Sequence, residues 1–287
     1  MRIALGTAQF GMNYGISNSA GKVKPEDVED ILKLAHLLGV DTIDTAPSYG
    51  ESEKVLGKIG VKEFKIVTKV PRCNDNFCRS ESWLSKTVDA SLTNLNRDTI
   101  DILLFHSPSD LFSANGKRLL GQVEDLKERG YVTKIGYSLY SPQELDRLTK
   151  LHWPDCVQVP VNLIDRRFPS SGWLKTLHER GVEVHARSAF LQGVLLQGEN
   201  ERPKFFRKWS DIFEDYDQWV AYKRLTRVQA TIGYLQSLSN IDRIVVGVLS
   251  KEQLAEIAKA ADQSVSEAPD ELTSNDEKLI NPSNWPR

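Results

Sequence analysis

Short apolar segments alternate with amphipathic segments along the chain, and eight such pairs can be counted. The apolar segments are predicted to be strands at residues 3–6, 41–46, 64–69, 100–106, 134–138, 156–159, 182–187 and 244–247. Eight strand–helix pairs without a Gly/Ser-rich linker predict a single closed (β/α)8 TIM barrel, an α/β fold with parallel strands and outer helices. Such barrels commonly reach about 250 residues as one domain. We therefore expect one domain over residues 1–287, with a polar C-terminal tail at about 262–287.

Two capping boxes mark helix starts, at Ser141-Pro142-Gln143-Glu144 and at Ser250-Lys251-Glu252-Gln253. In this pattern the serine and the Glu or Gln three residues later cap each other's backbone N–H groups. The last long helix before the eighth strand is predicted at residues 215–238. It follows a connection at 188–211, rich in charged and aromatic residues, that we expect on the rim of the active site.

The composition excludes several classes of protein. A net charge of −2 gives no basic surface for nucleic acid and no polybasic membrane patch. No apolar run has the length of a signal peptide or a transmembrane helix. Three cysteines suit a reducing cytoplasm better than a disulfide framework, and Cys73 and Cys78 lack a second pair of metal ligands. We therefore expect a cytoplasmic protein without a metal site and without nucleic-acid or membrane partners.

Three consecutive predicted strands end in chemically active side chains. Asp44, Lys69 and His106 end the second, third and fourth strands, and Tyr49 lies in the loop after the second strand. Catalytic residues of parallel α/β barrels collect at the carboxyl ends of the strands. An Asp–Lys pair or a strand-end histidine alone is more often structural. Together the four residues predict a proton-transfer site, because an ammonium beside a tyrosine stabilises the phenolate and lowers a pKa that is ordinarily about 10.

The order and spacing of these residues resemble the aldo-keto reductase family. Asp44-x4-Tyr49-Gly50, Lys69 and His106 resemble its catalytic tetrad. Further matching segments are Leu5-Gly6-Thr7-Ala8, Ser52-Glu53-x3-Gly57, Gln158-x3-Asn162-Leu163 and Arg187-Ser188-x3-Gln192-Gly193. The resemblance implies reduction of a carbonyl by hydride transfer from NAD(P)H, with Tyr49 as the general acid and His106 as a second donor to the carbonyl oxygen. Many members have an N-terminal hairpin, which we do not expect here because the first strand begins at residue 3.

The resemblance also implies a cofactor site. No Gly-x-Gly-x-x-Gly follows the first strand, so a Rossmann-type site is not supported. Barrels often bind phosphate at the loops after strands seven and eight. By resemblance, the cofactor-binding residues are Gly6, Thr7, Ala8, Ser138, Gln158, Asn162, Arg187, Ser188, Phe190, Gln192, Gly193, Gly247, Ser250, Lys251, Gln253 and Glu256.

Three positions depart from better-known members of the family. Leu139 stands where an asparagine commonly binds the nicotinamide carboxamide. Arg187 stands where an aromatic ring often stacks on the nicotinamide, and a guanidinium plane could stack similarly. Gln253 stands where an arginine usually pairs with the adenosine 2′-phosphate, which leaves Lys251 as the nearby cation. We expect NADPH (NADP+) as the cofactor, with a modest preference carried by Lys251 and with NADH as the alternative.

The expected substrate is a small carbonyl compound. Basic residues predicted near the rim favour a sugar or sugar derivative: Arg166, Arg167, Arg187, Lys204, Arg207 and Lys208. Two other functions stay open. One is a noncatalytic nucleotide-binding barrel that regulates a partner, like potassium-channel β-subunits, although that role does not require Tyr49 or Lys69. The other is a Schiff-base aldolase with Lys69 as the nucleophile, although Asp44 should keep Lys69 protonated.

Overall fold

Eight parallel strands close into a barrel in sequence order, and the last strand pairs with the first. The computed structural model describes residues 1–73, 80, 82–265 and 268–286. The strands are β1 (Ile3–Gly6), β2 (Thr42–Asp44), β3 (Lys65–Val70), β4 (Ile100–Phe105), β5 (Val132–Ser138), β6 (Cys156–Pro160), β7 (Glu183–Arg187) and β8 (Arg243–Gly247). The predicted (β/α)8 barrel is confirmed, and β1 is the first strand of the described chain.

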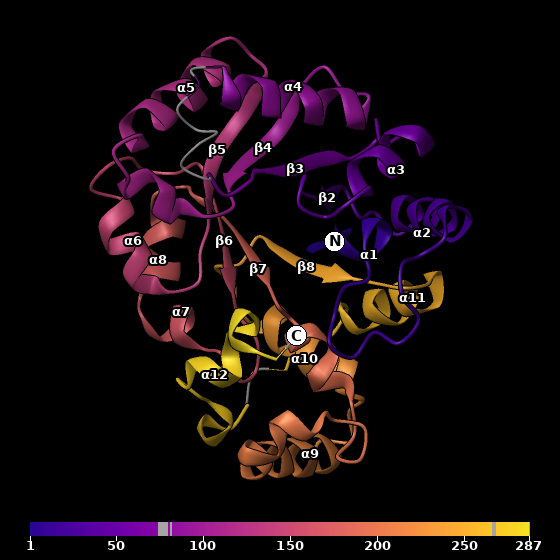
Figure 1. The fold of residues 1–287 in the computed structure, drawn as a ribbon. Helices are drawn as coiled ribbons and strands as arrows, with labels where there is room; N and C mark the ends of the chain where they lie inside the picture. The colour runs from indigo at the N-terminus through magenta and orange to yellow at the C-terminus, as the bar shows by residue number, and fades with distance from the viewer. Residues whose placement is uncertain (74–79, 81, 266–267, 287) are drawn as a thin grey trace.

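Helices surround the barrel (Figure 1). Those that follow the strands are α2 (Pro25–Leu37), α3 (Ser52–Ile59), α4 (Trp83–Leu95), α5 (Gly116–Glu128), α6 (Pro142–Leu148), α8 (Trp173–Glu179), α10 (Arg227–Ser237) and α11 (Lys251–Ala260). Additional helices are α1 (Ala8–Gly11), α7 (Arg167–Ser170), α9 (Ser210–Tyr222) and α12 (Glu277–Ile280). Short 3-10 segments are η1 (Pro108–Phe112), η2 (Leu191–Leu196), η3 (Lys204–Trp209), η4 (Asp270–Leu272) and η5 (Pro282–Asn284).

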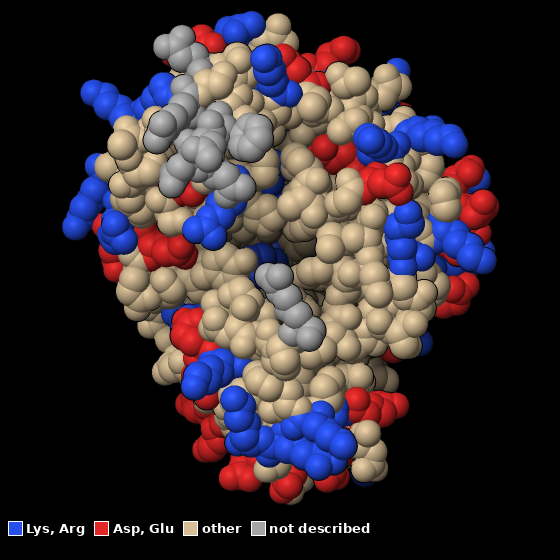
Figure 2. Space-filling view, in the orientation of Figure 1, with Lys and Arg blue, Asp and Glu red and all other residues tan. Residues whose placement is uncertain are grey.

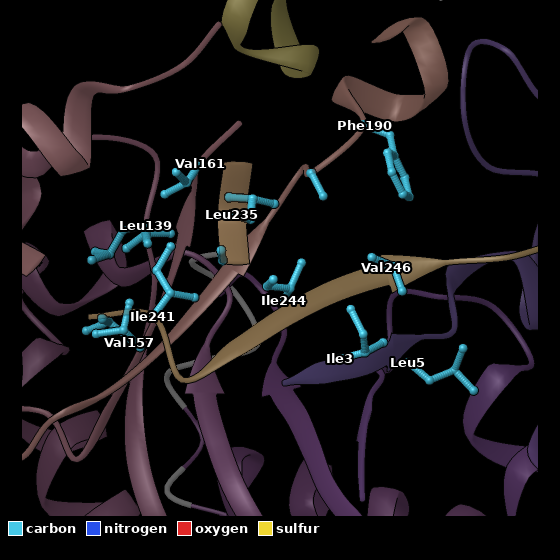
Figure 3. Packing of buried hydrophobic residues seen from close by; sticks show 14 of the residues in the cluster. Ile3, Leu5, Leu139, Val157, Val161, Phe190, Leu235, Ile241, Ile244 and Val246 are labelled. Carbon is cyan, nitrogen blue, oxygen red and sulfur yellow. The ribbon is translucent and has the colours of Figure 1, made fainter. Parts of the chain in front are cut away.

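Two apolar clusters lie on opposite faces of the sheet. The larger one packs strands against helices and includes Ile3 and Leu5 of β1 and Val246 of β8 (Figure 3). The smaller one consists of Val67, Ile102, Leu104 and Cys156. Side chains two residues apart share a face of a strand. Lys69 and Gln158 therefore follow Val67 and Cys156 on the inner face, so the barrel interior changes from apolar to polar toward the carboxyl ends of the strands.

One of the two predicted capping boxes is complete. At the start of α6, Glu144 Oε2 accepts from the backbone N–H of Ser141 at 3.0 Å, and the reciprocal contact is also present. At the start of α11, Ser250 Oγ accepts from the N–H of Gln253 at 3.4 Å. The side chain of Gln253 instead accepts from the N–H of Leu249 at 2.8 Å, so the second box is only half formed.

The prediction of a single helix at residues 215–238 is wrong. The chain forms α9 and α10, which are separated at residues 223–226. Arg224 has a φ of 55°, a left-handed conformation that interrupts a helix. Thr226 and Gln229 then form a complete capping box that starts α10. That box is visible in the sequence as Thr-x-x-Gln, and the continuous apolar pattern around it concealed the break.

The C-terminal tail, which the sequence shows only as polar and without a regular pattern, contributes apolar side chains to the core. Leu272, Leu279, Ile280 and Trp285 are buried in the main core, within or beside short helices. Trp285 Nε1 donates to Leu279 O at 3.1 Å. The side chain of Arg166 donates to the backbone oxygens of residues 268 and 269 and so attaches the tail to the loop after β6. The four apolar residues are too widely spaced to produce a periodic signal.

Three further observations concern the described residues. Cys156 is a free, buried thiol, and Cys78 lies outside the described residues. Within the described ranges, no helix is long and apolar enough to cross a lipid bilayer. The same ranges contain no group of three or more His, Cys, Asp or Glu side chains arranged to hold a metal ion.

Candidate active site

Asp44 and Lys69 meet inside the barrel near the carboxyl ends of β2 and β3. Lys69 Nζ donates to the two carboxylate oxygens of Asp44 at 2.8 and 2.9 Å and to Thr45 O at 2.9 Å. Gln158 Nε2 of β6 donates to the same carboxylate at 2.7 Å. Both side chains of the ion pair are almost fully buried. The charged end of Lys69 is therefore held in a fixed position by acceptors from β2 and the residue after it.

Tyr49 lies beside this pair. Its hydroxyl oxygen is 3.4 Å from Lys69 Nζ. The turn after it requires Gly50, which has a φ of 62°, and Gly11 of α1 packs against the turn. A Cβ on Gly11 would lie 1.8 Å from Tyr49 O, so only glycine allows this close approach. The backbone of α1 thus fixes the segment that carries Tyr49.

His106 follows β4 and faces the ring of Tyr49. The two ring centroids are 6.1 Å apart at an interplanar angle of 87°, an edge-to-face contact. Ser48 Oγ lies 3.3 Å from His106 Nδ1. If the hydroxyl donates to Nδ1, the proton of a neutral imidazole resides on Nε2, where it is available to a substrate oxygen. Three elements thus bring the four predicted residues together.

Burial dominates the electrostatics of Tyr49 and His106. Desolvation raises the pKa of the Tyr49 phenol, the Asp44 carboxylate raises it further, and Arg187 lowers it. This direction is opposite to the lowering that Lys69 alone was expected to cause. Desolvation also lowers the pKa of His106 to about 4, and the charge of Lys69 contributes to that shift. At neutral pH the phenol is therefore protonated and the imidazole is uncharged.

A cavity of about 860 Å³ opens beside Tyr49 and Asp44. Figure 2 shows one face of the molecule, which is hollowed near its centre. Predicted cofactor residues that line the cavity are Gly6, Thr7, Ala8, Gln158, Arg187, Ser188, Phe190, Gln192, Gly193, Gly247, Gln253 and Glu256. Most of the predicted cofactor set is thus brought to one cavity together with the tyrosine.

Four predicted cofactor residues are not among the described residues that line this cavity: Ser138, Asn162, Ser250 and Lys251. Asn162 supports the wall instead, because its Nδ2 donates to Ser188 O at 3.1 Å. Ser250 caps α11. Lys251 Nζ forms an ion pair with Asp30 at 3.0 Å, so its charge is engaged on α2. Sequence spacing could not predict this contact, which joins residues far apart in the chain.

Of the basic residues predicted near the rim, Arg187 lines the cavity. Its guanidinium donates to Leu139 O at 2.9 Å and packs on the ring of Tyr140, with the carbon at its centre 4.5 Å from the ring centroid. Arg166 holds the tail, and Arg167 pairs with Asp165 and Glu277. These two side chains have structural partners.

Several residues of the cavity wall were not predicted. A segment after α1 contributes Tyr14, Gly15, Ser17 and Asn18, the segment between β7 and α10 contributes Gln197 and Glu201, and the first residue of α10 is Arg227. Ser17 Oγ donates to Gln192 O at 2.8 Å, which connects the two segments. The signal in the sequence was the long stretch without apolar periodicity between the first strand and the first long helix, which indicates a loop at the rim of the barrel.

A closed parallel barrel with a buried Asp–Lys pair, a tyrosine and a histidine at the carboxyl ends of its strands has the architecture of α/β-barrel enzymes, whose active sites lie at that face. The model of the aldo/keto reductase family matches residues 2–273, and the chain belongs to this family. It is accordingly an oxidoreductase, of a family that uses nicotinamide cofactors and reduces carbonyl groups.

Two curated relatives are distant but span most of the chain. The chain is 26% identical to L-galactose dehydrogenase of Arabidopsis thaliana, over 91% of this chain and 86% of that protein. It is 23% identical to the NADH-specific methylglyoxal reductase of Escherichia coli K12, over 93% and 91% of the two chains. A holo-form aldo-keto reductase from Bacillus halodurans matches the fold with a TM-score of 0.73 at 19% identity, over 97% and 92% of the two chains.

Proposed function

We propose that this protein reduces the carbonyl of an aldehyde, a ketone or a sugar derivative with NADPH, and that Tyr49 is the general acid. The observation that carries the proposal is the Tyr49 hydroxyl, 3.4 Å from the ammonium of Lys69 and within the wall of a large cavity. Relatives named for L-galactose and methylglyoxal make a small carbonyl or sugar substrate the first choice.

The cavity suits a dinucleotide. Ligand pockets commonly measure about 300–1,000 Å³, and the cavity of about 860 Å³ lies within that range. Polar side chains that would hold the cofactor come from β6, the loop after β7 and α11: Gln158, Ser188, Gln192, Gln253 and Glu256. When bound, the nicotinamide supplies the hydride, and the protein supplies position and charge.

The proton step follows from the four side chains. Because burial raises the pKa of Tyr49, the phenol keeps its proton at neutral pH and can donate it to the oxygen that becomes an alkoxide. The phenolate left behind lies beside the Lys69 ammonium, which stabilises the negative charge. Asp44 and Gln158 hold that ammonium in place. Neutral His106 donates a second hydrogen bond to the substrate oxygen.

The geometry disfavours the two alternatives. A Schiff-base aldolase needs a free amine lone pair, whereas Lys69 Nζ already donates to Asp44 and Thr45 and lies within reach of Tyr49. A purely regulatory nucleotide-binding barrel does not require a buried Asp44–Lys69 pair beside a tyrosine. A cytoplasmic location stays a prediction from the sequence.

The test is a carbonyl panel with purified protein. NADPH is added, and the absorbance of the reduced nicotinamide is followed with aldehydes, ketones and sugars. The proposal expects carbonyl-dependent loss of absorbance. Nucleotide binding without turnover of any compound would instead support a regulatory barrel. Borohydride trapping of a substrate carbon on Lys69 would support the aldolase.

A further inference from the structure

Arg227, the first residue of α10, lies in the wall of the same cavity as Tyr49. Its neighbours Thr226 and Val228 also line the cavity, so the first turn of α10 forms part of the wall. The helices α10 and α11 lie close together in the fold (Figure 1). Arg227 therefore belongs to the same half of the barrel as the predicted cofactor residues Gln253 and Glu256.

The guanidinium of Arg227 is only partly engaged. Its Nη2 donates to Asp217 Oδ1 at 3.0 Å, and its Nε is buried without a hydrogen-bond partner. The same Asp217 oxygen accepts from Arg202 Nη2 at 2.7 Å, and the Nε of Arg202 is also buried without a partner. Two guanidinium groups thus share one carboxylate. A guanidinium has five N–H donors, so Arg227 keeps further donors for an incoming acceptor beside its contact with Asp217.

One further charged group lies near Arg227 in this part of the wall. Glu201 lines the cavity, and its Oε2 accepts from the backbone N–H of Gly198 at 2.8 Å. Arg202 is almost buried behind the wall, whereas about one third of the Arg227 side chain is exposed, at 33%. Arg227 is therefore the guanidinium of this pair that an incoming anion can reach.

Lys251, the cation expected from the sequence, does not compete for this role. Its ammonium pairs with Asp30, and the residue is not among the described lining of the cavity. A guanidinium also matches the geometry of a phosphate better than an ammonium does, because it donates two parallel hydrogen bonds. Thr226 caps the N–H of Gln229 at the start of α10. The N–H groups of Arg227 and Val228, in the same turn, have no partner within the helix and favour the same anion.

We propose that Arg227 binds a phosphate group of the dinucleotide in this cavity. The inference rests on the proposed use of a nicotinamide dinucleotide. The phosphate is either the pyrophosphate, which NADPH and NADH share, or the 2′-phosphate, which only NADPH has. Arg227 is then a specificity-determining residue in the second case and a general affinity residue in the first.

The experiment measures dissociation constants for NADPH and NADH separately, by quenching of tryptophan fluorescence. It compares wild type with Arg227→Gln, Arg227→Lys, Lys251→Gln and Lys33→Gln. Lys251→Gln removes the cation that the sequence indicated, and Lys33→Gln is the control, since it removes an exposed lysine charge that pairs with Glu29 on α2. Arg227→Gln should weaken NADPH binding about tenfold to a hundredfold, the range for a hydrogen bond to a charged group. Arg227→Lys should recover part of the loss, Lys251→Gln should lose less affinity than Arg227→Gln, and Lys33→Gln should bind as wild type does.

The comparison of NADPH with NADH identifies the phosphate that Arg227 binds. If Arg227→Gln loses affinity for NADPH alone, Arg227 binds the 2′-phosphate; if it loses equal affinity for both nucleotides, Arg227 binds the pyrophosphate. Either result supports the proposal. Unchanged binding of both nucleotides by Arg227→Gln would overturn it, as would a larger loss in Lys251→Gln. If the wild-type protein binds neither nucleotide, the proposed cofactor itself is wrong. That outcome differs from nucleotide binding that is the same in wild type and Arg227→Gln. If Arg227→Gln does not fold, the comparison of Arg227→Lys with wild type decides.

Discussion

Lys69 and Asp44 form an ion pair that is closed to solvent, with side-chain exposures of 0% and 3%. Nζ lies 2.8 and 2.9 Å from the two carboxylate oxygens, and Gln158 completes the hydrogen bonding of Asp44. Removing one partner of a buried pair leaves a charge that neither water nor protein neutralises. The pair therefore contributes to the stability of the barrel as well as to the site.

Lys69→Met should lower the free energy of unfolding by about 3–5 kcal/mol, because Asp44 would stay buried without its cation. Urea denaturation measures this change. The double variant Lys69→Met/Asp44→Asn should recover part of the loss. Lys65→Met is the control, since Lys65 is exposed and its ion pair with Asp41 is 3.7 Å long. A loss below about 1 kcal/mol in Lys69→Met would show that the pair is not held as described.

The imidazole of His106 should titrate near pH 4 in the folded protein, well below its ordinary 6.5. NMR of the histidine ring measures the midpoint, and His106→Asn identifies the resonance. Between pH 4 and 6.5 the unfolded chain binds this proton and the folded chain does not. Stability should therefore fall as the pH decreases through this interval, and His106→Asn should reduce the slope. A midpoint near 6.5 would contradict the buried, uncharged state.

Gly11→Ala should displace the turn that carries Tyr49. A Cβ at this position would lie 1.8 Å from Tyr49 O and 2.3 Å from Ser52 N, both backbone atoms. Overpacking of this kind typically costs about 1–3 kcal/mol, and turnover should fall with it. Gly121→Ala on α5 is the matched control, because a Cβ there meets nothing within 4 Å. Equal stability and turnover in the two variants would refute the close contact.

Trp285→Ala should destabilise the protein by about 3–5 kcal/mol, the usual cost of removing a buried aromatic side chain. Trp285 packs edge-to-face on Phe206, with centroids 4.9 Å apart, and joins the tail to η3. Tyr222→Ala removes an aromatic residue that is 82% exposed and should change stability by less than about 0.5 kcal/mol. Thermal or urea unfolding compares the two, and similar losses would mean that the tail is not part of the core.

The barrel could be predicted because its signals are local. Each strand and helix has its own apolar period, and the order of the pairs fixes the topology. The positions of Asp44, Tyr49, Lys69 and His106 followed from strand ends that meet at one rim. What the sequence could not predict depends on contacts between distant residues. Lys251 pairs with Asp30, Trp285 packs on Phe206, and burial raises the pKa of the Tyr49 phenol.

The most direct test of the account is the turnover of Tyr49→Phe. The variant keeps the ring and loses only the hydroxyl, so the dissociation constant for NADPH should stay at the wild-type value. Turnover of the best carbonyl substrate should fall by about 10²–10⁴-fold, the usual contribution of general acid catalysis. Tyr222→Phe, on the exposed end of α9, should be as active as wild type. If Tyr49→Phe reduces the substrate at a rate near that of wild type, Tyr49 is not the proton donor.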